Sequence, residues 1–146
     1  MDEIMNKNLI VLDMEAKSKE EVIRKLAKVI QNSGRLNDYE GYTAQVFDRE
    51  KEFPTAIGFD VAIPHGKTDC VNTAAVAFAR LKDCVAWSDE EKARYVFLIA
   101  VPASQAEDKH LQILAQLSRS IMREEFREKL KNASSVEEIL NTITLK

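Results

Sequence analysis

The sequence lacks the positive charge and the ligand spacing that nucleic-acid-binding and zinc-binding proteins normally carry. Lysine and arginine number 21 against 24 aspartates and glutamates, so the formal net charge of the 146 residues is −3. A nucleic-acid or anionic membrane partner normally requires a basic excess. The two cysteines, Cys70 and Cys84, and the two histidines fit no zinc-ligand spacing. We therefore expect no nucleic-acid partner, no metal, and two reduced cysteines that act as small packing residues.

Long apolar runs and glycine-rich loops are also missing. The longest apolar run spans residues 95–101, whereas a membrane-spanning helix needs about 20 residues. The first residues are acidic and do not look like a secretory signal. Four glycines, no Walker loop and no GxSxG motif argue against P-loop enzymes and nucleophile-elbow hydrolases. These absences favour one cytoplasmic domain over residues 1–146, without membrane insertion.

What the sequence does contain is an alternation of strand-like and helix-like segments. Apolar residues 9–12 predict a buried strand. A capping box at residues 18–21 predicts a helix that ends near Gly34. A second capping pattern, which begins at Asn37, predicts a helix that ends at residue 49 or 50.

The rest of the chain continues this alternation. Residues 53–58 are expected to form a loop or an irregular strand. Further strands are expected over residues 61–63, 73–81, 85–87 (a short edge strand) and 93–101. Helices are expected over residues 105–122 (after a Ser104–Glu107 capping box), 124–130, and from a cap at Ser134 or Ser135 to about 143. The pattern predicts a single α/β domain with a mixed β-sheet of about five strands flanked by helices.

His65 follows the strand expected over residues 61–63. Pro64 should end that strand and Gly66 should let the backbone turn sharply. His65 would then lie on a loop held by a rigid sheet, where reactive groups commonly lie. A surface loop histidine without a role is the alternative, because Pro-X-Gly is common turn chemistry.

His110 lies near the start of the helix expected over residues 105–122. His110, Leu114, Leu117 and Ile121 recur at helical spacing, so the histidine heads an apolar stripe that faces the core. The positive end of the helix dipole disfavours an imidazolium there and is able to bind an anion. A hydrogen-bonded core histidine is the alternative.

Three blocks of the sequence together resemble a known family. The first comprises R-E at residues 49–50, P-T-A-I-G at 54–58 and V-A-I-P-H-G at 61–66. The second is H-L-Q-I-L-A-Q-L at 110–117, and the third is the tail over 126–140. They resemble the enzyme IIA domains of the fructose/mannitol type (type 2) in the bacterial phosphoenolpyruvate:sugar phosphotransferase system, over nearly the whole chain.

The chain also departs from that family's pattern. Ala56 and Asp60 stand at two positions where the family commonly has glycine, and the pair Phe53–Pro54 is similar to galactitol-type relatives. These departures bear on the geometry of the loop and on the identity of the sugar.

The resemblance implies a phosphohistidine carrier in sugar uptake, with a fructose-, mannitol- or galactitol-like sugar. His65 matches the family's histidine, which accepts a phosphoryl group from the phosphocarrier HPr and passes it to a cysteine of enzyme IIB, and so to membrane enzyme IIC. His110 matches an orienting or hydrogen-donating residue. Arg49 matches a residue that stabilises the phosphoryl group, although by itself it reads as a surface arginine paired with Asp48 or Glu52. No cofactor is implied.

Two other functions stay open at this point. A regulatory, nitrogen-type enzyme IIA, whose phosphorylation state controls partner proteins, would keep the same A-I-P-H-G motif. A binding module without phosphorylation is the other alternative, and the paired histidines disfavour it.

Overall fold

The computed structural model describes residues 4–104 and 107–143, and the side chains of all of these except residues 107–110. A short 3₁₀ turn (Lys7–Leu9) precedes the first strand. The strands are β1 (Ile10–Met14), β2 (Ala56–Gly58), β3 (Val61–Ala62), β4 (His65–Thr68), β5 (Ala75–Ala86) and β6 (Lys92–Pro102). The helices are α1 (Lys19–Asn32), α2 (Tyr39–Glu52), α3 (Glu107–Ile121), α4 (Glu124–Asn132) and α5 (Val136–Thr142).

The strands form one mixed sheet, which confirms the predicted fold class with six strands where about five were expected. The order is β1-β5-β6-β3-β2, and β4 pairs with β6 beyond β3. Strands β3 and β4 both run parallel to β6, whereas β5 runs antiparallel to it. β6 is thus the central strand on which both segments around Pro64 are aligned.

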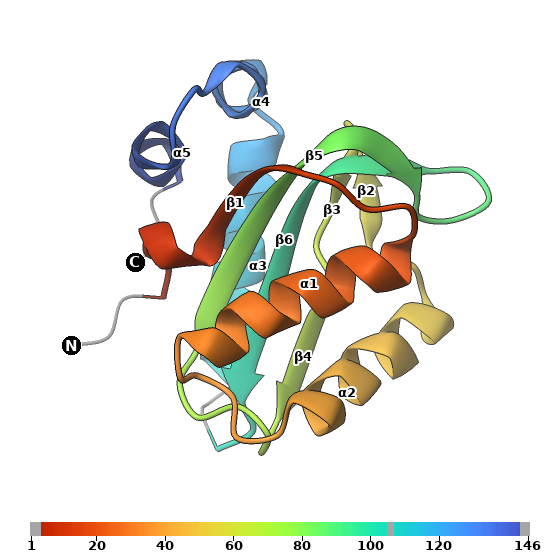
Figure 1. The fold of residues 1–146 in the computed structure, drawn as a ribbon, viewed down its shortest axis with the longest axis vertical. Helices are drawn as coiled ribbons and strands as arrows, with labels where there is room; N and C mark the ends of the chain where they lie inside the picture. Colours follow the sequence, from red (N-terminus) through yellow and green to blue (C-terminus); the bar gives the residue numbers. More distant parts are fainter. Residues whose placement is uncertain (1–3, 105–106, 144–146) are drawn as a thin grey trace.

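Helices cover both faces of the sheet (Figure 1). Helices α1 and α2 pack on one face, and the apolar cluster beneath them, here called the α1–α2 core, includes Val96, Leu98 and Ala100 of β6. Helices α3, α4 and α5 pack on the other face, and the α3–α5 core includes Phe97, Ile99 and Val101. This alternation along β6 follows from the twofold side-chain period of a strand.

The capping predictions are confirmed at two helices and wrong at one. Ser18 accepts a hydrogen bond from the Glu21 backbone N–H at 3.1 Å, and Ser135 caps α5. At α2 the cap is Asp38, whose carboxylate accepts from the Gly41 N–H at 3.0 Å. Asn37 instead donates to the Asp69 carbonyl and the Asn72 side chain. Because aspartate and asparagine are equivalent N-caps, the pattern alone could not choose between adjacent positions.

The chain does not turn at Gly66, so the prediction of a strand-end loop around His65 is wrong. Residues from His65 to Thr68 continue along β6 as β4. Pro64 has no backbone N–H and so lacks one hydrogen-bond donor. Its carbonyl still accepts from the Ile99 N–H at 3.0 Å, which keeps the segment aligned with β6. Gly66 allows close packing instead, because a methyl group there would lie 3.1 Å from both Tyr42 and Val46 of α2.

Other expectations need smaller corrections. Residues 73–81 and 85–87 do not form two strands, because β5 runs continuously through a register shift between Arg80 and Val85. Cys84 is exposed and so is not a packing residue, whereas Cys70 is half-buried against the α1–α2 core. Residues 105 and 106 and the side chain of Glu107 lie outside the described part of the chain, so the Ser104–Glu107 capping box stays a prediction. Within the described residues, we find no helix with the length and apolar content needed to cross a membrane.

Candidate functional site

His65 is the first residue of β4, and the sheet register determines where its side chain points. His65 pairs with Ile99 of β6, and paired residues on neighbouring strands project from the same face. Ile99 belongs to the α3–α5 core. The His65 ring therefore projects on the face that α3 covers, while Gly66 faces α2.

One hydrogen bond determines which ring nitrogen of His65 carries the proton. The Nδ1 atom lies 3.0 Å from the backbone carbonyl oxygen of Ile63. A carbonyl oxygen only accepts, so Nδ1 carries the hydrogen and donates it. In the neutral ring the lone pair is then on Nε2, and a lone pair of this kind is able to act as a nucleophile.

The pKa of His65 lies below its ordinary value of 6.5. Burial of the half-exposed ring is the main cause, because a charged imidazolium loses hydration. The positive charge of Arg49 lowers the pKa further, while the Ile63 carbonyl and the charge of Glu50 act in the opposite direction. The ring is therefore neutral at neutral pH, as a nucleophile must be.

Arg49 lies in the last turn of α2, and its positive charge is one of the causes that lower the pKa of His65. Its guanidinium donates to the Phe53 carbonyl at 3.1 Å. Among the described residues, no carboxylate lies within 4.0 Å of Arg49, so neither Asp48 nor Glu52 forms the expected surface ion pair. The effect of the Arg49 charge on the His65 pKa supports a shared site for these two residues, which stays a prediction.

Glu50 is a buried residue whose role the sequence did not reveal. Its side chain is 3% exposed, and its Oε1 atom lies 2.8 Å from Lys19 Nζ. The same oxygen accepts from Trp87 Nε1 at 3.1 Å and from the Thr55 N–H at 3.2 Å. Its second oxygen accepts from the Thr55 hydroxyl. The only sequence signal for Glu50 was its place beside Arg49 in the family motif.

The backbone of His110 lies in the first turn of α3, but its side chain lies outside the described part of the chain. β4 and β6 run parallel, and the Ala103 N–H donates to the Thr68 carbonyl at 3.2 Å, so both strands end side by side before α3 begins. Helix α3 covers the face on which His65 projects (Figure 1). Of the predicted stripe, Leu117 and Ile121 are buried and Leu114 is half-buried. A shared site for the two histidines stays a prediction.

The loop before His65 accommodates the missing family glycines in two different ways. Asp60 adopts the left-handed conformation, with φ 61°, and its neighbour Phe59 does the same, with φ 58°. Aspartate tolerates this region better than most residues. The Asp60 carbonyl also accepts from the backbone N–H groups of Arg94 and Tyr95, which ties the turn to β6. Ala56 needs no special backbone conformation, because it lies in β2 and pairs with Ala62 of β3.

Three large apolar side chains in the segment that follows α2 are exposed: Phe53, Ile57 and Phe59 are 69%, 42% and 49% accessible. Phe59 also stacks beneath the guanidinium of Arg127, 3.9 Å from the ring centre. Exposed large hydrophobic groups close together are typical of surfaces that contact another protein.

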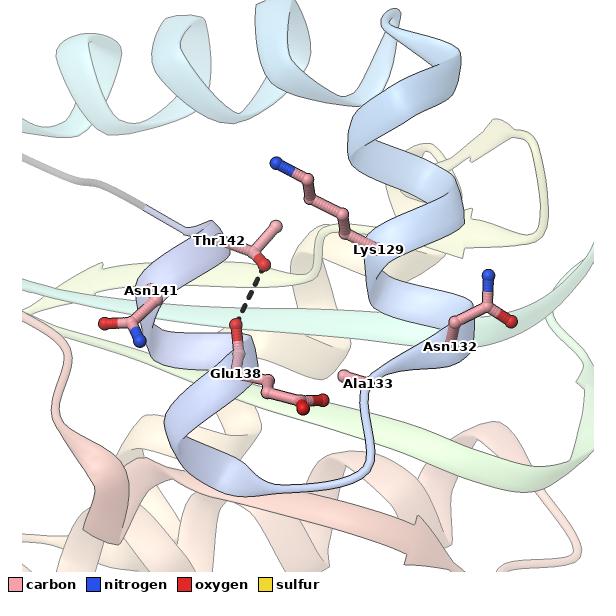
Figure 2. A pocket seen from close by; sticks show the side chains of 6 residues that line it. All are labelled: Lys129, Asn132, Ala133, Glu138, Asn141 and Thr142. Carbon is pink, nitrogen blue, oxygen red and sulfur yellow. Dashed lines mark hydrogen bonds between the residues drawn. The ribbon is translucent and has the colours of Figure 1, made fainter.

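A separate hollow lies between α4 and α5 (Figure 2), and no residue of β4 or α2 lines it. Its carboxylate, Glu138, already accepts hydrogen bonds from the Ser134 backbone and side chain. Among the described residues, we find no cluster of three or more histidine, cysteine or acidic side chains placed to hold a metal ion.

Comparison with known proteins identifies close relatives of this chain. Residues 3–146 match the family model of the phosphoenolpyruvate-dependent sugar phosphotransferase system, EIIA 2. The chain is 40% identical over 143 residues to the fructose-specific EIIABC component of Bacillus subtilis; the match covers 97% of this chain but only 22% of that protein. It is 39% identical over 137 residues to the fructose-specific EIIA component of Haloferax volcanii, covering 92% of this chain and 88% of that protein.

Solved structures agree with the sequence relatives. The nitrogen regulatory protein IIA-Ntr from Neisseria meningitidis superimposes with a TM-score of 0.88 at 31% identity, covering 97% of both chains. Enzyme IIA mannitol of Escherichia coli, in its complex with phosphorylated enzyme IIB mannitol, gives a TM-score of 0.81 at 30% identity, covering 94% of both chains. The chain therefore belongs to the type 2 EIIA family of the phosphoenolpyruvate-dependent sugar phosphotransferase system, and is a phosphotransferase component as its motifs implied.

Proposed function

We propose that the Nε2 atom of His65 accepts a phosphoryl group from phospho-HPr and passes it to a cysteine of enzyme IIB. The observation that carries this proposal is the hydrogen bond from Nδ1 to the Ile63 carbonyl, which leaves the lone pair on Nε2. A lowered pKa keeps that lone pair free of a proton at neutral pH.

The two transfers balance without a cofactor. The Nε2 lone pair attacks phosphorus while the N–P bond of the phospho-HPr histidine breaks, and the electron pair of that bond returns to the donor's ring. The proton of His65 stays on Nδ1, where it is donated in the hydrogen bond to the Ile63 carbonyl, so the phosphorylated ring can carry positive charge. A protonated ring is the better leaving group when a thiolate of the next protein attacks phosphorus.

Arg49 supplies the positive charge that the transferred group requires. The phosphoryl group carries up to about two negative charges. A guanidinium about 4 Å away contributes up to roughly 4 kcal/mol at an effective dielectric constant of 20. Arginine has five N–H donors, so its bond to the Phe53 carbonyl leaves others for phosphoryl oxygens.

His110 is proposed to orient the group rather than to accept it. Its backbone lies in the first turn of α3, where the helix dipole favours an anion. A neutral imidazole there donates an N–H to a phosphoryl oxygen. The variant His110→Ala should still be phosphorylated but should pass the group to enzyme IIB poorly. Normal onward transfer by this variant would leave His110 as a core histidine.

The partners and the sugar are proposed from the relatives. A mannitol enzyme IIA forms a complex with phosphorylated enzyme IIB, and curated relatives carry fructose-specific names. We assign this chain to the same route, from HPr to enzyme IIB and through it to enzyme IIC, for a fructose-like sugar. The route runs in the cytoplasm, which stays a prediction for this chain.

A regulatory function is the second candidate. It is favoured by the match to IIA-Ntr of Neisseria meningitidis, with a TM-score of 0.88 over 97% of the chain. Such a protein would use the same histidine chemistry, but its phosphorylation state would be the output.

Reconstitution tests the proposal and separates the two candidates. The purified chain is incubated with phosphoenolpyruvate, enzyme I and HPr, and then with enzyme IIB of the fructose type. We expect an acid-labile, base-stable adduct that is absent from His65→Ala and that transfers to enzyme IIB. An adduct that no sugar-type enzyme IIB accepts would favour the regulatory function. Equal phosphorylation of His65→Ala would overturn the assignment of the acceptor.

A further inference from the structure

Glu50 is a buried carboxylate that the transfer chemistry does not use. With its side chain 3% exposed, it has to be stabilised by its neighbours. Four donors do so: Lys19 Nζ, Trp87 Nε1, and the backbone N–H and hydroxyl of Thr55. These donors come from α1, from the turn between β5 and β6, and from the loop after α2. Glu50 therefore ties three separate segments together beside the proposed acceptor.

A continuous series of hydrogen bonds links Glu50 to the His65 ring. Both donors of Thr55 are held by the Glu50 carboxylate. The Thr55 carbonyl accepts from the Ile63 N–H at 3.1 Å. The Ile63 carbonyl in turn accepts from His65 Nδ1 at 3.0 Å. The position of the carbonyl that selects the ring tautomer thus depends on Thr55, and Thr55 on Glu50.

A second, shorter branch runs from Glu50 to Arg49. The two residues are adjacent in the last turn of α2. The Arg49 guanidinium donates to the Phe53 carbonyl, and Phe53 lies two residues before Thr55. The same carboxylate therefore holds the loop against which both the acceptor ring and its cationic neighbour are placed.

We propose that Glu50 is a positioning residue that holds the His65 ring in its Nδ1-protonated tautomer and Arg49 beside it, through Thr55 and the loop between α2 and β3. This inference rests on the proposed function of His65. Glu50 does not touch the reacting atoms, because its oxygens are occupied by Thr55, Lys19 and Trp87.

Lys19 completes the arrangement. It lies 2.8 Å from Glu50 Oε1, donates to the Trp87 carbonyl at 3.2 Å, and is itself only 19% exposed. Its positive charge offsets the carboxylate, so the site gains a rigid anchor without gaining net negative charge. An unpaired carboxylate here would repel the incoming phosphoryl group.

The test compares variants of the anchor with a matched destabilised control. Thr55→Val keeps the branched shape and removes only the hydroxyl donor to Glu50. Glu50→Ala removes the whole anchor, whereas Glu50→Gln keeps an oxygen for Thr55, Lys19 and Trp87. The control, Arg80→Met, removes another buried charge, one that donates to the carbonyls of Leu130 and Ala133 near α4.

Two quantities are measured for each variant: the rate constant for phosphoryl transfer from phospho-HPr, per folded molecule, and the His65 tautomer by ¹⁵N NMR of the unphosphorylated protein. A displaced reacting group costs up to about a hundredfold in rate. We expect Glu50→Ala to lose at least about tenfold, Thr55→Val to fall between it and the parent, and Glu50→Gln to recover most of the loss. The Nδ1-protonated tautomer should decrease in the same order.

Three results are informative. Unchanged transfer and tautomer in both Thr55→Val and Glu50→Ala would overturn the positioning role, as would an equal loss in Arg80→Met. If Glu50→Ala fails to fold, the transfer rate and the His65 tautomer of Thr55→Val decide whether the positioning role holds. If the parent His65 is not phosphorylated, the proposed function fails, but the tautomer measurement still tests the link from Glu50 to His65.

Discussion

Gly66→Ala should destabilise the protein, although the backbone at this position would accept alanine. Gly66 is not among the residues with positive φ, so replacing it reduces the entropy of the unfolded chain and would by itself stabilise by about 0.4–1 kcal/mol. Against this, the new methyl group would lie 3.1 Å from Tyr42 Cε1 and 3.1 Å from Val46 Cγ2.

Neither neighbour of Gly66 is able to move aside. Tyr42 and Val46 are fully buried, and the Tyr42 hydroxyl is fixed to the Ile99 carbonyl at 2.8 Å. Valine in a helix has one strongly preferred rotamer. Helix α2 would therefore have to shift away from β4, and overpacking of this kind costs about 1–3 kcal/mol. The cost exceeds the entropic gain, so the expected net loss is roughly 0.5–2 kcal/mol.

The assay is thermal unfolding together with phosphoryl transfer. Near this chain length, 1 kcal/mol corresponds to a shift of roughly 2–4 °C in Tm. Because α2 carries Arg49, transfer should slow as well. Gly34→Ala is the control: its φ is 80° with nothing within 4 Å, so it costs about 1–2 kcal/mol through the backbone alone and should leave transfer unchanged. A Gly66→Ala protein as stable as the parent would refute the close packing of α2 on β4.

Three further predictions concern the site. Arg49→Ala should slow transfer while changing the free energy of unfolding by no more than about 0.5 kcal/mol, as measured by urea unfolding; a large loss of stability with normal transfer would make Arg49 structural. Because burial lowers the pKa of His65 below 6.5, the acceptance rate should decrease as the pH falls through the folded pKa, that is, at a lower pH than for an ordinary histidine. The unfolded chain binds the proton more readily than the folded chain, so the stability that the neutral ring contributes is fully present above pH 6.5 and is lost as the pH falls through the folded pKa. His65→Ala should weaken this loss in pH-dependent unfolding. Phe53→Ser should raise the KM for the protein donor with little change in kcat. The control is Met122→Ser at the far end of α3, where the side chain is 68% exposed against 69% for Phe53, and this variant should leave the KM unchanged. Equal effects of the two substitutions would exclude a specific docking role for Phe53.

Local signals in the sequence predicted much of the fold. Ser18 was identified as a cap, and Ser135 as one of two candidates with Ser134, because capping depends on residues three positions apart. The continuation of the strand beyond Pro64 was missed because it depends on β6, whose Ile99 N–H uses the Pro64 carbonyl. The close approach of α2 to Gly66 was missed for the same reason: it is a contact between distant segments.

The candidate site was predictable in part. His65 and Arg49 were singled out by the family motif, and the positive charge of Arg49 lowers the pKa of the His65 ring. The sequence did not predict a buried role for Glu50, since a glutamate at a helix end is usually solvated. Its burial results from Lys19 and Trp87, which lie on other elements. No local pattern contains that information.

The measurement that tests the central claim most directly is the identity of the phosphorylated nitrogen. The chain is labelled with ¹⁵N-histidine, phosphorylated through HPr, and examined by ¹⁵N and ³¹P NMR under basic conditions. Because Nδ1 is bound to the Ile63 carbonyl, we predict one phosphohistidine, at Nε2 of His65. Phosphorylation at Nδ1 of His65, or at His110, would contradict the proposed role of the ring.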